Sequence, residues 1–297
     1  MTHLIEKKIY QRALAAYLGL ACGDALGATL EFLSPQQIRQ RYGVHREICG
    51  GGWLNLQAGQ VTDDTQMCLA IGQAIIARQG WDIKAIADHF LAWMQTDPPD
   101  IGNTVRRGIN RYRDTGELFS LPLPDAAGNG ACMRNLPVAI FSLFQPDRLA
   151  EYSLQQSHIT HNHPLSDAAV LSFGRITQAL ILGRDMMVVN AEISALISAH
   201  PQFEFKPYPG KASAYIVETV QTVLHCFLNT SSFEDCLIAT VNQGGDADTT
   251  GALAGMLAGA HYGLAAIPER WLQALDQQVV REITAQTREL LVLGQSS

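Results

Sequence analysis

The chain has 297 residues, of which 47% are hydrophobic and only 16% are charged. A chain of this length and composition can bury a large core without disulfides or structural metals. The formal net charge of −7 argues against a nucleic-acid-binding surface, which would carry clustered lysine and arginine.

The six cysteines are scattered along the chain and include no Cys-x-x-Cys pair. We interpret them as reduced core residues of a cytoplasmic protein. The first residues lack the apolar core of a signal peptide. The most apolar long stretch, residues 251–267, is too short for a transmembrane helix and contains His261 and Tyr262. We therefore expect a buried helix there and no transmembrane segment.

The first predicted element is a helix over residues 5–27, where apolar residues recur at helical spacing. It carries Gly19, Gly23 and Gly27 at four-residue intervals, and a second row of glycines with the same spacing lies within residues 251–263. Glycine destabilises a helix interior, so the rows predict two helices whose backbones approach a neighbour closely. A contact between these two helices would explain both rows.

The next residues, 28–60, are predicted to be irregular. For residues 50–53, Gly-Gly-Gly-Trp, we favour a turn over part of a pocket wall. Apolar periodicity and Gly or Pro stop signals predict the further helices. They cover residues 66–79, 81–94, a segment from about 104, a segment ending at 144, then 166–182, 215–228, 233–241, 251–267 and one or two helices within 272–293. Pro98 and Pro99 exclude regular helix from residues 95–104, the loop between the helix predicted over 81–94 and the one that begins near 104. Without a persuasive strand pattern or linker, we predict one all-α domain spanning residues 1–297.

The most informative motif lies near the C-terminus, where Asp246 and Asp248 follow two glycines and precede Thr249. Glycines allow a sharp turn, which would crowd two carboxylates and a hydroxyl together. Such crowding is unfavourable unless a positive charge neutralises it, and hard cations prefer oxygen ligands. The alternative is an ordinary helix start capped by Asp and Thr side chains. Taken alone, the motif fits both interpretations.

Thr62, Asp63 and Asp64 repeat this arrangement at the start of another predicted helix, so the two motifs together offer four carboxylates, enough for two divalent cations. Oxygen ligands without thiolates favour Mg²⁺ or Mn²⁺ over Zn²⁺. A pair of such ions can hold substrate oxygens and activate water. Asp24, within the first glycine row, is better explained as a capped or paired core carboxylate.

Two predicted loops add further candidates. Residues 95–104 contain Asp97, Asp100 and Asn103, and residues 158–163 contain three histidines without an HExxH motif. We interpret at least two of these histidines as structural and keep His161 as a candidate substrate contact.

These motifs, in this order and at this spacing, resemble the ADP-ribosylglycohydrolase family over nearly the whole chain. The matching segments are residues 23–27 with Glu31, 62–65, 99–104, His161 and 244–251. The resemblance implies a compact all-α fold with a dinuclear Mn²⁺ or Mg²⁺ centre in a cleft. The metal ligands it implies are Thr62, Asp63, Asp64, Asp246, Asp248 and Thr249.

By the same resemblance, the reaction is hydrolysis of the N-glycosidic bond between ADP-ribose and an arginine side chain. Asp100 would be the catalytic general acid/base, with Asp97 as the competing candidate. The substrate-binding residues that the resemblance suggests are Glu31, Asn103, His161 and Tyr215. Tyr215 would stack on adenine, although its helical setting fits core packing equally well.

The length and the Asp-Pro-Pro-Asp loop look most like the dinitrogenase reductase-activating branch of the family. The target of that branch is the ADP-ribosylated iron protein of nitrogenase. The branch implies a PII-type signalling protein and an ammonium-channel complex as partners, and hence reversible peripheral membrane association of a cytoplasmic protein. Three alternatives stay open: hydrolysis of a serine- or O-acetyl-linked ADP-ribosyl group, a non-catalytic ADP-ribose-binding relative, and a two-metal phosphatase.

Overall fold

The computed structural model describes residues 2–296, and within them all regular structure is helical apart from two isolated bridges. The α-helices are α1 (Thr2–Gly27), α2 (Pro35–Tyr42), α3 (Asp63–Arg78), α4 (Ile83–Met94), α5 (Asn103–Thr115), α6 (Gly130–Met133), α7 (Leu136–Phe141), α8 (Pro146–His158), α9 (Pro164–Ile181), α10 (Met186–Ala199), α11 (Ile216–Leu228), α12 (Phe233–Val241), α13 (Ala247–Tyr262), α14 (Glu269–Ala274) and α15 (Gln277–Ser296). Three 3-10 helices complete them: η1 (Pro124–Ala126), η2 (Pro201–Phe203) and η3 (Leu264–Ala266). The prediction of an all-α fold is confirmed.

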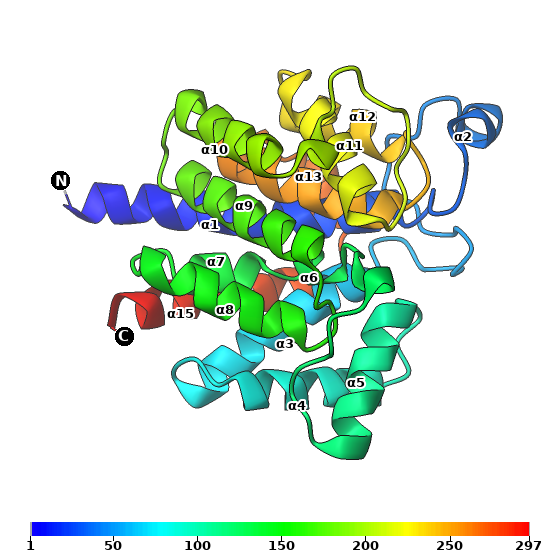
Figure 1. The fold of residues 1–297 in the computed structure, drawn as a ribbon. Helices are drawn as coiled ribbons and strands as arrows, with labels where there is room; N and C mark the ends of the chain where they lie inside the picture. The colour runs from blue at the N-terminus through cyan, green and yellow to red at the C-terminus, as the bar shows by residue number, and fades with distance from the viewer. Residues whose placement is uncertain (1, 297) are drawn as a thin grey trace.

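Helices α1 and α13 lie against each other through the middle of the fold (Figure 1). A Cβ atom added at Gly23 would lie 1.9 Å from the carbonyl oxygen of Gly251, and one at Gly19 would lie 2.2 Å from that of Gly255. These distances are far below van der Waals contact, so the approach requires residues without a side chain. The predicted contact between the two glycine rows is confirmed, except at Gly263, which ends α13 with φ of 82° and faces open space.

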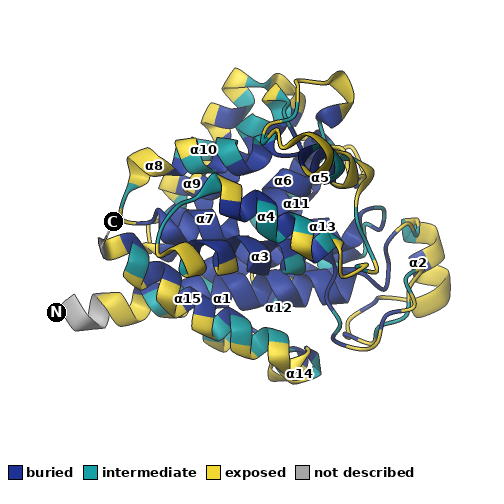
Figure 2. Ribbon diagram, turned by 90° about the horizontal axis from the view of Figure 1, so that it is seen from below, coloured by how far each residue is buried: buried dark blue, intermediate teal, exposed yellow. Residues whose placement is uncertain are grey.

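The remaining helices surround this pair. Helices α9, α11 and α12 pack against α13, whereas α15 packs against α1, α3 and α7. In Figure 2, buried residues predominate along α1, α3 and α7, and exposed residues lie on outlying helices such as α2 and α14. None of the helices within residues 2–296 is both long and apolar enough to span a lipid bilayer.

Both acidic motifs lie against the C-terminal end of α1. Asp24 accepts hydrogen bonds from the backbone amides of Thr62 and Thr65 at 3.0 and 3.1 Å, and so caps the start of α3. A Cβ at Gly27 would lie 2.1 Å from the carbonyl oxygen of Ala247, the first residue of α13. The interpretation of Asp24 as a capping core carboxylate is confirmed, and α1 brings both helix starts to one place.

Several helix boundaries differ from the predictions. Helix α2 lies within residues 28–60, which were predicted to be irregular. Its start is a capping box, in which Ser34 Oγ accepts from the Gln37 amide and Gln37 Oε1 accepts from the Ser34 amide. Only Ile38 of this helix is buried, so apolar periodicity carries little signal there.

Helices α8 and α10 were not identified from the sequence either. The helix predicted to end at residue 144 is divided into α6 and α7, with Arg134 and Asn135 between them. Pro137 near the start of α7 lacks a backbone N–H, so it cannot continue the hydrogen-bond series of α6.

Candidate metal centre and active site

One cavity of about 360 Å³ gathers acidic residues from segments that are far apart in the sequence. Its walls are formed by Glu31, Phe32, Asp63, Asp100, Gly102, Asn103, Thr104, Val105, Gly128, Asn129, Gly130, Met133, His161, Ala214, Asp246, Asp248 and Thr249. Both acidic motifs, the Asp100 loop and His161 therefore reach the same space.

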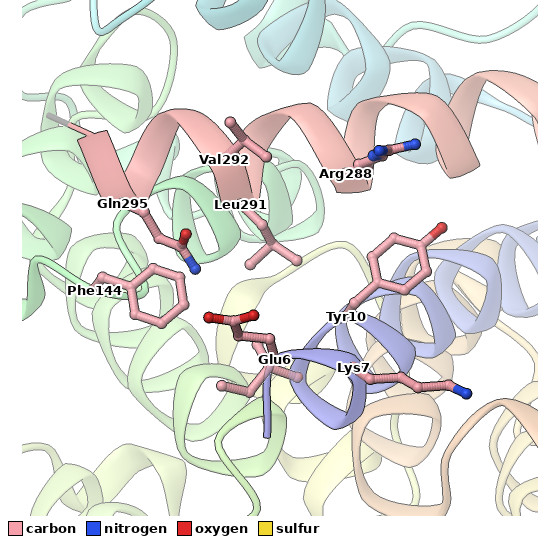
Figure 3. A pocket seen from close by; sticks show the side chains of 9 residues that line it. Glu6, Lys7, Tyr10, Phe144, Arg288, Leu291, Val292 and Gln295 are labelled. Carbon is pink, nitrogen blue, oxygen red and sulfur yellow. The ribbon is translucent and has the colours of Figure 1, made fainter. Parts of the chain in front are cut away.

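A larger cavity of about 440 Å³ lies between the first part of α1 and the last part of α15 (Figure 3). Tyr10, Phe144, Arg288 and Leu291 are among its lining residues, and its single carboxylate belongs to Glu6. It shares no lining residue with the acidic cavity and contains none of the sequence motifs. The acidic cavity is therefore the candidate active site.

The motif at the start of α13 is shaped by a backbone turn. Gly244 and Gly245 have φ of 69° and 64°, a region that other residues rarely adopt. A Cβ at Gly245 would lie 1.9 Å from the carbonyl oxygen of Ala212, and the amide of Asp246 donates to that oxygen at 2.6 Å. The turn thus fixes the backbone that carries the first aspartate of the motif.

The two acidic motifs are in direct contact. Thr249 Oγ1 donates to Asp64 Oδ2 at 3.2 Å, and Thr62 Oγ1 lies 3.3 Å from the same oxygen. The other oxygen, Asp64 Oδ1, is buried and has no hydrogen-bond partner in the described protein. An unpaired buried carboxylate oxygen is costly, so this atom is well placed to face a cation.

A second group of carboxylates lies at the same cavity. One oxygen from each of Glu31, Asp100 and Asp248 lies within 4.8 Å of the others, which is close enough for one metal ion to contact all three. From the sequence, Glu31 is predicted to contact the substrate and Asp100 to be the catalytic group. The structure adds that both side chains lie beside a predicted metal ligand.

Burial is the main cause of raised carboxyl pKa values throughout this cluster. It raises the pKa of Asp24 to about 6 and that of Glu31 to about 8. Burial and neighbouring carboxylates raise the pKa of Asp63, Asp64 and Asp248 well above the usual range. Burial also raises the pKa of Asp100 and Asp246. So many carboxyl groups require either protons or cations, and their hard oxygen donors fit Mg²⁺ or Mn²⁺.

Of the predicted substrate contacts, Glu31, Asn103 and His161 line the acidic cavity, and Tyr215 does not. Tyr215 precedes α11, is 41% exposed and is absent from the cavity wall, so the core-packing alternative is wrong. Asp97 is exposed and also lies outside the wall.

The other two histidines of the loop have structural partners. His158 Nε2 lies 3.0 Å from both carboxylate oxygens of Asp167. His163 Nδ1 accepts from the Leu165 amide at 3.1 Å and caps α9. The interpretation of at least two of these histidines as structural is confirmed.

Two contributions to the site were not predicted from the sequence. Asn129 Nδ2 donates to Asp246 Oδ2 and, at 2.9 Å, to Thr219 Oγ1. Trp53 follows the Gly50–Gly52 turn, and its Nε1 donates to Glu31 Oε2 at 2.5 Å. A glycine-rich turn ending in Trp is a weak signal, because only the folded chain shows which carboxylate it reaches.

An all-α domain whose buried carboxylates line one cavity, with a further carboxylate on a loop, offers the hard oxygen donors that could hold divalent cations. The family model of the ADP-ribosylglycohydrolases matches residues 6–296, and the chain belongs to this family. It is similar to the ADP-ribosyl-[dinitrogen reductase] glycohydrolase of Rhodospirillum rubrum, with 53% identity over 96% of this chain and 97% of the relative.

Two further similarities agree with this family. The ADP-ribosylarginine hydrolase Tri1 of Serratia proteamaculans is 33% identical over 92% of this chain and 77% of its own length. A solved structure described as an ADP-ribosylglycohydrolase-related protein complex matches with a TM-score of 0.85 and 32% identity, covering 97% of this chain and 99% of the other.

Proposed function

We propose that this protein hydrolyses the N-glycosidic bond between ADP-ribose and an arginine side chain of dinitrogenase reductase, the iron protein of nitrogenase. The observation that carries the proposal is the meeting of both acidic motifs with Asp100 in one cavity. The names of the relatives from Rhodospirillum rubrum and Serratia proteamaculans supply the substrate and the linkage.

The proposed cofactor is a pair of Mn²⁺ or Mg²⁺ ions. The residues that would hold them are Thr62, Asp63, Asp64, Asp246, Asp248 and Thr249, with Glu31 and Asp100 close by. When bound, such ions can hold ribose oxygens and polarise water. The buried unpaired oxygen of Asp64 supports this assignment.

Asp100 is the proposed general acid/base. It lies on the loop before α5, only partly buried, and burial raises its carboxyl pKa. A raised pKa brings a carboxyl group closer to the pH at which it can both donate and accept a proton. Asp97, the competing candidate, lies outside the cavity wall, so we favour Asp100.

The remaining candidates are proposed as substrate contacts. Glu31, which accepts a hydrogen bond from the Trp53 indole, would contact the arginine guanidinium. Asn103 and His161 line the cavity. Asn103 would contact the ribose or the guanidinium, and His161 would be a further substrate contact. Tyr215 directly follows Ala214 of the cavity wall, and its exposure leaves its ring accessible for stacking on adenine.

The test is incubation with ADP-ribosylated iron protein, with and without Mn²⁺, while free ADP-ribose is measured. We expect metal-dependent release of intact ADP-ribose. Release of inorganic phosphate would favour a two-metal phosphatase. Cleavage confined to serine-linked peptides or O-acetyl-ADP-ribose would favour another linkage. Binding of ADP-ribose without turnover would favour a non-catalytic relative.

The regulatory partners proposed for this branch are a PII-type signalling protein and an ammonium-channel complex. Their recruitment would place a cytoplasmic protein at the membrane reversibly. Co-sedimentation with channel-containing vesicles, with and without the PII-type protein, tests this. Equal sedimentation with vesicles that lack the channel would exclude it.

A further inference from the structure

A fully buried arginine lies behind the acidic cavity. Arg134, between α6 and α7, has no exposed surface, and its guanidinium lies 4.5 Å from the ring centroid of Phe90. Its Nε donates to Gln156 Oε1 at 2.8 Å, and its Nη2 donates to the Gln156 carbonyl oxygen at 2.9 Å. Its Nη1 also donates to Met67 Sδ at 3.8 Å. These contacts fix the plane of the guanidinium, so its remaining hydrogen bond has a defined direction.

That remaining bond runs from Arg134 Nη2 to Thr160 Oγ1 at 2.8 Å. Thr160 is buried, and its Oγ1 lies 2.7 Å from Nδ1 of His161. A guanidinium is only a donor, so the threonine oxygen accepts from Arg134. Among the hydrogen bonds of residues 2–296, the hydroxyl proton then has one acceptor within reach, Nδ1 of His161.

This order of donors sets the tautomer of the imidazole. If Nδ1 carried the proton, two donors would point at Thr160 Oγ1 and its own buried hydroxyl proton would have no acceptor, which typically costs about 1–3 kcal/mol. With Nδ1 as the acceptor, the ring proton resides on Nε2. Burial and the nearby charge of Arg134 lower the pKa of His161 to about 3, so the ring stays neutral near pH 7.

The position of Nε2 directs this proton into the cavity. A Cβ added at Gly128 would lie 2.9 Å from Nε2, and one at Gly130 would lie 2.8 Å from Cε1. These glycines thus give the ring a space that larger residues would fill. All three residues line the acidic cavity, and the described part of the chain provides no hydrogen-bond partner for Nε2.

We propose that Arg134 and Thr160 are positioning residues that hold His161 as the neutral Nε2–H tautomer, so that the ring donates one hydrogen bond to a phosphate or ribose oxygen of the substrate. The proposal rests on the function proposed above, because it takes ADP-ribose as the ligand. It makes His161 a fixed donor and excludes it as a proton carrier or a charged phosphate clamp.

The first experiment measures the tautomer directly. The protein is labelled with ¹⁵N-histidine and loaded with Mg²⁺, since Mn²⁺ would broaden the spectrum, and long-range ¹H–¹⁵N correlations are recorded from pH 5.5 to 8. The chain has nine histidines, and the His161→Asn variant identifies the signals of His161. We expect a bare Nδ1 and a protonated Nε2 throughout. A protonated Nδ1 or an imidazolium in the wild type would overturn the proposal.

The second experiment measures binding of ADP-ribose by calorimetry. Thr160→Val removes the hydroxyl at constant shape, so it should populate both tautomers and weaken binding about threefold to tenfold, as expected for one hydrogen bond. Thr160→Ser should stay within about twofold. The matched control is Thr177→Val, which removes a buried hydroxyl that has no partner and lies outside the acidic cavity. It should leave tautomer and affinity unchanged.

The outcomes separate the two proposals. If Thr160→Val changes the tautomer but not the affinity, or if His161→Asn binds ADP-ribose as tightly as the wild type, the positioning role is wrong. If the wild type binds ADP-ribose with the expected tautomer but never cleaves ADP-ribosyl-arginine, the proposed function fails and the positioning role stands.

Discussion

The acidic cavity has two parts that are built in different ways. Its floor is formed by the two acidic motifs, which lie at helix starts and are buried. Asp63, Asp246, Asp248 and Thr249 line the cavity, and Thr62 and Asp64 lie directly behind them. Its rim consists of loop residues, including Asp100 and the exposed Phe32. Trp53, which contacts Phe32, and Tyr215, which follows Ala214, lie beside this rim. Helix packing holds the floor, whereas single contacts hold the rim. Substitutions in the floor should therefore change stability and metal binding, and substitutions in the rim should change turnover.

The largest expected effect belongs to the rim. Asp100→Asn removes the proposed acid/base group and should lower turnover by about 10²–10⁴-fold, while the circular dichroism spectrum and bound metal stay unchanged. The matched control is Asp97→Asn on the same loop, which should retain wild-type turnover. Wild-type release of ADP-ribose by Asp100→Asn would exclude the catalytic role.

The next effect is the pH dependence of stability when no metal is bound. In EDTA, the folded protein keeps protons on carboxyls that the unfolded chain has lost, because burial raises the pKa of Asp24 from 3.8 to about 6 and that of Glu31 from 4.5 to about 8. The stability that these groups contribute is then greatest below pH 4 and falls as the pH rises through 6 and 8, by about 5 kcal/mol in total between pH 5 and 8. Thermal unfolding should show this fall, and Mg²⁺ should restore stability at pH 8.

Two variants check the origin of that slope. Glu31→Gln removes the buried carboxyl whose pKa is raised to about 8 and should flatten the pH dependence in EDTA. Asp97→Asn removes an exposed carboxyl outside the cavity and should leave it unchanged. An EDTA-treated protein whose stability is constant or rises between pH 5 and 8 would contradict the argument.

A smaller loss of stability is expected from a change of Asp24, which caps α3 and so supports the floor. Asp24→Asn leaves amide and hydroxyl donors of Thr62 and Thr65 facing an NH₂ group, so unfolding in the presence of Mg²⁺ should require about 2 kcal/mol less. The control is Asp82→Asn, the cap of α4 at the surface, where asparagine caps equally well. Equal stability of the two variants in urea titrations would show that Asp24 is not a structural cap.

Sequence alone predicted the floor better than the rim. The glycine rows of α1 and α13 and the two Asp-Thr motifs depend on local spacing, which a linear pattern records. Trp53 reaching Glu31, or Asp100 approaching Asp248, depends on how loops return to the core, and no periodicity encodes that. Helix α10 shows the same limit for the fold, since its exposed Met187 and Val188 blur the apolar face.

The smallest effect is expected at Asn129. Its side chain supports only the half of the floor that belongs to α13. Asn129→Ala removes the hydrogen bond to Asp246 Oδ2, a proposed metal ligand. Loss of a hydrogen-bond partner of a metal ligand typically weakens metal binding by about tenfold. Calorimetric titration with Mn²⁺ measures this. The control is Asn135→Ala, a buried asparagine bonded to Ser153 Oγ at 3.0 Å and outside the cavity wall, which should lose similar stability but keep wild-type metal affinity. If both variants bind Mn²⁺ like the wild type, Asn129 contributes packing only, and the α13 turn alone orients Asp246.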